Sequence, residues 1–284
     1  MSQETINWFV TEQLPTVTHK FQNKGHLLRG MFQPPVRAEA DTVKWKIAGR
    51  AEAKPLQRGA RGHEMNASRS EISAQLQSWQ AADWVWHDDL ARINANEMAV
   101  ISETAGMALG RRCDLIPINA MNAASLTTVG DGSTAFTLID ALTGIQLLQS
   151  AEVPFDNQWY CGLPSKAWAQ FTSYKQVNNA DWRGHNAQLP YNTNTQHVLW
   201  NGVNWFRWPD SYSPVPTANQ YDFFLWHRSS VGMFDGYEVK MNVTWENLYS
   251  GWYMNSRISQ ASAVLLPEGI IRFRFASNSA ITLN

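Results

Sequence analysis

The sequence has 284 residues, which exceeds the usual size of a single domain, so we expect one large domain or two interleaved ones. A formal net charge of −1 excludes a strong general attraction to nucleic acid or to an anionic membrane. Only 17% of the residues are charged and 14 are Trp. Either a partner covers much of the surface, or the chain has a Trp-rich core or a carbohydrate-binding face.

The cysteine content and the first residues bear on the compartment. Cys113 and Cys161 are too few for a disulfide framework and favour a reducing environment. The start of the sequence lacks the basic and apolar regions of a signal peptide. No run of 18 apolar residues occurs, so we expect no membrane-spanning segment.

Residues 1–37 predict an extended arm. Residues 4–14 suit a short helix that Pro15 ends. The rest of the arm has few consecutive apolar residues, so it has little core of its own and needs another surface to lie on. We expect Phe21 and Leu28 to be among its contacts with neighbouring copies.

Residues 42–48 and 71–76 alternate between apolar and polar side chains, which predicts two strands with one buried face each. Trp45 lies on the apolar side of the first strand. Between Asp41 and Arg69 there are seven Lys or Arg against three Asp or Glu. We therefore predict a long projecting hairpin with a basic tip that contacts another copy, although a solvated loop remains the alternative. The predicted contact residues of the tip are Lys54, Arg58 and Arg61.

The next predicted element is a single helix from Asp88 to Asp114. An acidic pair stands at its start and an arginine pair near its end, which suits the helix dipole, and no proline occurs before Pro117. About 26 helical residues would span roughly 40 Å, which is long for a globular domain.

Short helices and strands follow. Residues 122–134 are small and polar and suggest a linker. A helix is predicted over residues 136–150, with these apolar side chains at helical spacing: Phe136, Ile139, Leu142, Ile145 and Leu148. The stretch E-V-P-F-D-N-Q-W-Y-C-G-L-P-S-K-A-W-A-Q (152–170) predicts a turn, a strand at 159–163 and a helix that begins near Pro164.

The last third of the chain is mainly β. Asn201-Gly202 marks a hairpin between two aromatic-rich strands. Further strands are predicted at 223–227, 231–234, 237–243, about 249–266 and in G-I-I-R-F-R-F. The fold class is α+β, with one very long helix and antiparallel strands gathered toward the end.

A search of the sequence for catalytic or metal-binding patterns finds none. L-P-S-K-A-W matches neither a G-x-S-x-G elbow nor an S-x-x-K pair, and no glycine-rich phosphate loop occurs. The seven histidines are scattered without metal-ligand spacing, and the two cysteines suit buried free thiols. We therefore predict no enzyme, no cofactor and no metal, and a structural role for residues 152–170.

Several stretches, taken in order, resemble the major capsid protein of tailed bacteriophages with the Hong Kong ninety-seven type fold. K-F-Q-N-K-G-H-L-L-R-G-M-F resembles part of its N-terminal region, and A-D-W-V-W-H-D-D-L-A-R with A-L-G-R-R-C-D-L-I resembles its spine helix. V-P-F-D-N-Q-W-Y-C-G-L-P-S-K-A-W resembles an A-domain stretch. T-W-E-N-L-Y-S through L-P-E-G-I-I-R-F resembles the late P-domain strand and the last A-domain strand. Residues 200–208 contain more Trp than this pattern, which suggests a decorated or differently packed A-domain edge.

The resemblance implies a division of the chain. It comprises an N-terminal arm (1–37), an E-loop (38–82), a P-domain spine helix (83–121), an A-domain (122–235), P-domain strands (236–265) and a C-terminal A-domain strand (266–284).

The resemblance also implies a function. It implies a protein that self-assembles as pentamers and hexamers into the icosahedral head shell of a tailed phage. The shell would enclose double-stranded DNA without sequence-specific binding, and portal, scaffold or cement proteins are further partners that it allows. The implied location is the virion, after assembly in the bacterial cytoplasm. An encapsulin-type nanocompartment is the alternative within the fold, and a Trp-rich carbohydrate-binding module is the alternative from a different class.

Overall fold

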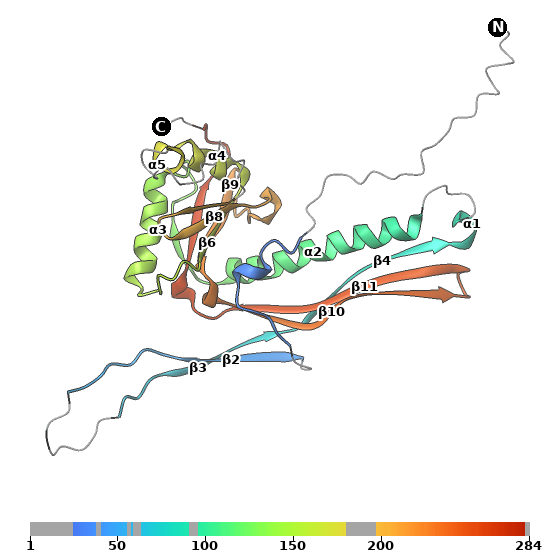
Figure 1. Cartoon of the computed structure of the whole chain (residues 1–284), viewed down its shortest axis with the longest axis horizontal. Helices are drawn as coiled ribbons and strands as arrows, with labels where there is room; N and C mark the ends of the chain where they lie inside the picture. Colours follow the sequence, from blue (N-terminus) through green and yellow to red (C-terminus); the bar gives the residue numbers. More distant parts are fainter. Residues whose placement is uncertain are drawn as a thin grey trace, which may run out of the picture. The chain divides into compact units, whose positions relative to one another are not determined.

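The computed structural model describes residues 25–37, 41–55, 58, 64–90, 96–179 and 197–281 (Figure 1). Within these residues the chain forms two compact units. The first combines Gly25 and His26 with Ser78–Arg112 and Tyr237–Ser259. The second contains the described parts of Leu27–Gln77, Cys113–Gly236 and Gln260–Asn284. Both helices and strands are present, which confirms the α+β class.

The main elements of the first unit are part of a long helix and three strands. β4 (Gln77–Trp86), β11 (Gly251–Val264) and β10 (Val231–Glu246) are neighbours in one sheet, in the order β10-β11-β4. The long helix α2 (Glu97–Ala123) contributes its first part to this unit. The strands predicted at 231–234 and 237–243 are therefore one continuous strand.

The helix predicted from Asp88 to Asp114 is wrong at both ends. α1 (His87–Leu90) is one short turn, Asn96 is not helical, and α2 runs for 27 residues from Glu97. The Asn96 side chain accepts a hydrogen bond from the Ala99 N–H at 3.3 Å, as an N-capping residue does, so the helix begins after it. At the other end, α2 continues through Pro117 despite the backbone hydrogen bond that a proline cannot donate.

The second unit is built on a six-stranded sheet. Its strands are, in spatial order, β5 (Thr127–Val129), β12 (Ile270–Ala276), β9 (Gln220–His227), β6 (Trp159–Leu163), β8 (Val203–Arg207) and β7 (His197–Trp200). The β5–β12 and β6–β8 pairs are parallel and the other pairs are antiparallel. The expected linker at 122–134 thus contains an edge strand.

Three helices and several short elements complete this unit. The helices are α3 (Leu138–Ser150), α4 (Ser165–Ser173) and α5 (Lys175–Asn178). One-turn 3-10 helices occur at Arg29–Met31, Asp210–Tyr212, Arg228–Ser230 and Pro267–Gly269. β1 (Val36–Arg37) pairs in parallel with the first part of β10, and β2 (Thr42–Ala48) pairs with β3 (Arg69–Gln75) as a separate two-stranded sheet.

Local sequence patterns explain several of these elements. Asn201 and Gly202 have φ angles of 49° and 75°, the left-handed conformation that a two-residue hairpin turn needs, and Trp200 pairs with Val203 across it. The predicted strand at 159–163 and the helix start after Pro164 are confirmed. Thr137 and Asp140 form a capping box at the start of α3.

The buried face of α3 differs from the predicted face. Ala141, Ile145 and Leu148 are buried, whereas Ile139 and Leu142 are 74% and 43% exposed. Gly144 lies against Phe273, where an added Cβ would meet a ring atom at 2.4 Å. The close approach of Gly144 to Phe273 therefore places the side of α3 that carries Ala141, Ile145 and Leu148 against the sheet.

The core of the second unit is aromatic. Phe136 lies at its centre, with ring centroids 5.2–6.5 Å from five other rings: Phe171, Trp205, Phe223, Phe273 and Phe275. Trp205 and Trp208 are 0% and 1% exposed, so these two rings belong to the core, which favours the differently packed edge over the decorated one. No helix within the described residues is long and apolar enough to cross a membrane.

Candidate assembly surfaces

Hydrogen bonds fix the strand–turn–helix junction at residues 159–166. The Ser165 N–H and hydroxyl each donate to the Asp210 carboxylate at 2.6 Å. The Lys166 ammonium donates to the Ser277 carbonyl at 2.7 Å. Both side chains therefore tie α4 to segments far away in the sequence, which agrees with the structural role predicted for this stretch.

A Ser–His–Asp constellation occurs at residues 229, 227 and 156, and its geometry is that of a cap. The His227 Nδ1 lies 2.6 Å from the Ser229 hydroxyl and accepts the Ser229 backbone N–H at 3.3 Å. Since a backbone N–H only donates, Nδ1 is the accepting nitrogen, and Nε2 faces Asp156 at 3.2 Å. The histidine thus caps the turn at Arg228–Ser230.

Buried charged groups hold the second unit together. Asp114 is 2% exposed and accepts hydrogen bonds from the Leu27 and Leu28 N–H groups and from the Tyr212 hydroxyl at 2.9–3.1 Å. Asp222 is fully buried and accepts two hydrogen bonds from Arg274 at 2.9 and 2.8 Å. These carboxylates are engaged by donors of their own chain.

The two thiols are not suited to nucleophilic chemistry. Burial, together with nearby carboxylates, raises the pKa of Cys113 to about 11, and burial raises the pKa of Cys161 well above its usual range. Among the described residues, no three His, Cys, Asp or Glu side chains lie close enough to hold a metal ion.

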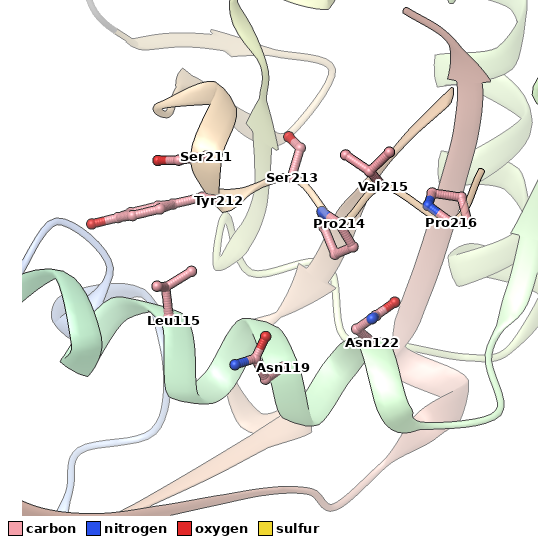
Figure 2. Close-up of a pocket in the computed structure, with 9 residues that line it drawn as sticks. All are labelled: Leu115, Asn119, Asn122, Ser211, Tyr212, Ser213, Pro214, Val215 and Pro216. Carbon is pink, nitrogen blue, oxygen red and sulfur yellow. The ribbon is translucent and has the colours of Figure 1, made fainter. Parts of the chain in front are cut away.

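Figure 2 shows a surface hollow of about 310 Å³ between α2 and the segment that follows the turn at Asp210–Tyr212. Leu115, Asn119 and Asn122 line it from α2, and residues 211–216 line it from the opposite side. These lining residues include no carboxylate, histidine, lysine, arginine or cysteine. The hollow therefore offers shape and amide groups rather than acid–base chemistry.

The hairpin β2–β3 forms a two-stranded sheet of its own in the second unit. Its strands alternate as predicted, with Val43, Trp45 and Ile47 half-buried and Lys44 and Lys46 exposed. Each of the two strands packs mainly against the other. Lys44 and Lys46 therefore lie on an exposed face of the hairpin, whereas its apolar face is partly covered.

The base of this hairpin is fixed on its own chain. Trp45 lies beside Gly232, where an added Cβ would meet its ring at 3.0 Å. Arg50 donates to the Ala151 carbonyl at the end of α3 and lies 3.3 Å from Glu152 and 3.6 Å from Glu268. Beyond Arg50 the described residues of the hairpin are almost all exposed, including Lys54 and Arg58.

The six residues predicted as contacts between subunits have different positions. Lys54 and Arg58 are exposed on the hairpin, whereas Phe21 and Arg61 lie outside the described residues. Trp45 is half-buried beside Gly232. Leu28 is fully buried in the core of its own chain, so the prediction of an intersubunit contact is wrong for Leu28. The buried Asp114 explains this, because it binds the backbone of Leu27 and Leu28.

Sequence reasoning missed an exposed aromatic group in the first unit. Trp86, Trp245 and Tyr249 are 46%, 39% and 55% exposed, and neighbouring rings of β4 and β11 pack beside them. The signal was present in W-V-W and in T-W-E-N-L-Y-S-G-W-Y, which concentrate six aromatic residues near one another in the sequence.

Comparisons with known proteins are consistent with this architecture. The chain matches the family described as phage capsid protein over residues 6–277. Its fold is similar to the capsid of the cyanophage P-SCSP1u (TM-score 0.74, 15% identity, 96% of this chain and 94% of the other). It is also similar to the capsid of Ralstonia phage GP4 (TM-score 0.69, 9% identity, 95% and 96%). A virus-like particle from Pyrococcus furiosus shares the fold at a TM-score of 0.55, with 11% identity and 88% and 92% coverage.

No curated protein sequence matches the chain at a significant level. The structural relatives are under 25% identical and show the fold, whereas the family match spans nearly the whole chain. The fold, with its long helix and open hairpin, agrees with that match. The chain belongs to the phage capsid protein family, as a major capsid protein that forms the shell of a phage head.

Proposed function

We propose that copies of this chain assemble as pentamers and hexamers into an icosahedral shell around double-stranded DNA, and that the β2–β3 hairpin selects neighbouring copies. One observation supports the hairpin's role most: its strands pack mainly against each other and its basic residues are exposed. The exposed part of the hairpin beyond Arg50 can gain contact area on another copy.

The proposed contact is electrostatic and weak for each copy. Lys54, Arg58 and Arg61 would lie on acidic surface of a neighbouring subunit rather than on DNA. An exposed ion pair contributes roughly 0–1 kcal/mol, which salt screens. Repetition of the same pair around a closed shell multiplies this small preference and sets which neighbour is chosen.

The chain is proposed to act without catalysis, in the virion, after assembly in the host cytoplasm. The acid–base groups described above are engaged in caps and in buried ion pairs, which supports a structural role. Portal, scaffold or cement proteins are compatible additional partners. The names arm, E-loop, P-domain and A-domain remain proposals for the division of the chain.

Electron microscopy of the purified full chain tests the proposal. We expect closed shells from the wild type and a slower or misdirected assembly from Arg58→Glu/Arg61→Glu. Lys175→Glu, an exposed charge reversal on α5, is the control and should assemble as the wild type does. Normal shells from the Arg58→Glu/Arg61→Glu variant, at normal rate, would refute the role of the hairpin.

The contribution of the arm needs a truncation that spares the core. Removal of residues 1–33 would also remove Leu28 and Phe32, both 0% exposed, and would unfold the second unit. A chain that begins at Gly25 should stay folded and lose assembly, as measured by circular dichroism and electron microscopy. Closed shells of normal size and stability from this chain would show that residues 1–24 are dispensable.

A further inference from the structure

Two contacts hold the paired strands of the β2–β3 hairpin on the second unit. Trp45 lies beside Gly232, where an added Cβ would meet its ring at 3.0 Å. Arg50 follows five residues later, up to roughly 17 Å away along the chain. One contact alone would leave the hairpin free to turn about it. The contact at Arg50 therefore determines the direction in which the residues after it project.

The Arg50 guanidinium meets acceptors from two other segments. It donates to the Ala151 carbonyl at the end of α3 and lies 3.3 Å from a carboxylate oxygen of Glu152 and 3.6 Å from one of Glu268. Among the described residues of 42–75, no other Lys or Arg side chain has a hydrogen bond or ion pair with an acceptor outside the hairpin. We call these four residues the Arg50 cluster.

Glu152 is an unfavourable residue for the end of its own helix. Its φ is +58°, the left-handed conformation that favours glycine, and the Val153 N–H donates to the Leu148 carbonyl at 3.2 Å, as in a glycine-terminated helix. Its carboxylate also stands at the negative end of the helix dipole, where Arg50 supplies the compensating positive charge. A residue that is strained at its own helix end indicates a role in what it contacts.

Water reaches all three charged side chains of the cluster. Those of Arg50, Glu152 and Glu268 are 59%, 76% and 54% exposed. Exposed ion pairs are weak and are screened by salt, so the cluster can open and close without disturbing the core. The contact is therefore reversible, unlike the buried pair between Asp222 and Arg274.

We propose that the Arg50 cluster fixes the direction of the hairpin, and that Glu152 is a positioning residue that acts through Arg50. When the cluster is closed, the hairpin is held at both Trp45 and Arg50. When salt or the loss of a charge opens it, the hairpin turns about Trp45 and its exposed part samples a wider range of directions. The consequence for assembly rests on the proposed function: a closed cluster limits which neighbouring copies Lys54 and Arg58 reach.

Distances between two spin labels in the unassembled full chain test this proposal. One label is placed on Ala53→Cys, three residues beyond Arg50. The other is placed on Ile139→Cys, an exposed position near the opposite end of α3, about 18 Å along the helix from the cluster. The native thiols are buried and have raised pKa values, so they react slowly with the label.

The width of the distance distribution reports whether the cluster is closed. We expect Arg50→Gln and Glu152→Gln to widen it at least about twofold. Salt at about 1 M, where charges are screened beyond about 3 Å, should do the same to the wild type. Glu52→Gln removes an exposed carboxylate of the hairpin that lies outside the cluster, so it is the matched control and should leave the width unchanged.

A stability measurement separates positioning from a merely structural role. Glu152→Gly and Glu152→Gln both remove the charge, and only glycine relieves the left-handed backbone. Glu152→Gly should therefore unfold at a higher urea concentration than Glu152→Gln, while both widen the distance distribution equally. An unchanged width in Arg50→Gln and Glu152→Gln would overturn the proposal, and so would a lower urea midpoint for Glu152→Gly. Both measurements use unassembled chains, so such a failure would be distinct from a failure to form shells.

Discussion

The buried ion pair between Asp222 and Arg274 allows the sharpest test of what holds the second unit together. Asp222 is 0% exposed and accepts both hydrogen bonds of the Arg274 guanidinium, at 2.9 and 2.8 Å. Asp222→Asn keeps the shape, removes the charge and turns one acceptor into a donor that faces another donor. Removal of one partner of a buried pair costs about 3–5 kcal/mol.

The environment of Arg274 lowers this figure. Its side chain is 31% exposed, so water can solvate the charge that loses its partner. We therefore expect a loss of about 2–3 kcal/mol, from the lower part of that range after screening by solvent. With a urea dependence of about 3 kcal/mol/M, the unfolding midpoint should fall by about 0.7–1 M.

Tryptophan fluorescence during urea unfolding measures this loss in the correct unit, because Trp159, Trp205, Trp208 and Trp226 are buried there. Glu71→Gln is the control. It removes an exposed pair with Lys44, whose atoms lie 3.6 Å apart, and should cost at most about 1 kcal/mol. If Asp222→Asn lowers the midpoint no more than Glu71→Gln does, the pair does not stabilise the sheet as argued.

Three further predictions follow from single sites. Gly162→Ala would place a Cβ 2.3 Å from the Trp208 ring and should cost about 1–3 kcal/mol by the same fluorescence assay; an unchanged midpoint would contradict the packing described. Ile101→Pro should lower the free energy of unfolding by about 3 kcal/mol or more, because it removes a backbone hydrogen bond within α2. Circular dichroism during urea unfolding would measure this loss. A variant as stable as the wild type would show that α2 is not continuous there. Stability should fall as pH rises from about 9 to about 11, because the unfolded chain releases the Cys113 proton near its ordinary pKa while the folded chain keeps it. Urea unfolding midpoints of Cys113→Ala should fall less over that range. An equal fall in the variant and the wild type would exclude this thiol as a cause.

The elements that sequence predicted well are those that local chemistry determines. Asn201-Gly202 specifies its own turn, and the alternation around Trp45 specifies a strand with two different faces. The predicted start of the long helix was wrong because Asp88 and Asn96 are both good N-capping residues. The surrounding structure determines which of the two caps the helix.

Tertiary contacts decided what sequence could not. The outward position of Ile139 on α3 follows from the close approach at Gly144, which involves a residue far along the chain. The burial of Leu28 follows from Asp114, a partner 86 residues away. The basic hairpin was visible as a charge count, whereas the aromatic group around Trp86 needed the pairing of separate strands to bring its members together.

The position of the β2–β3 hairpin in an assembled shell tests the central claim most directly. A reconstruction of shells from the full chain by electron cryomicroscopy would locate it. We predict that Lys54, Arg58 and Arg61 lie within about 4 Å of carboxylates of a neighbouring copy. A tip that faces the lumen against DNA, or that touches no other subunit, would contradict it.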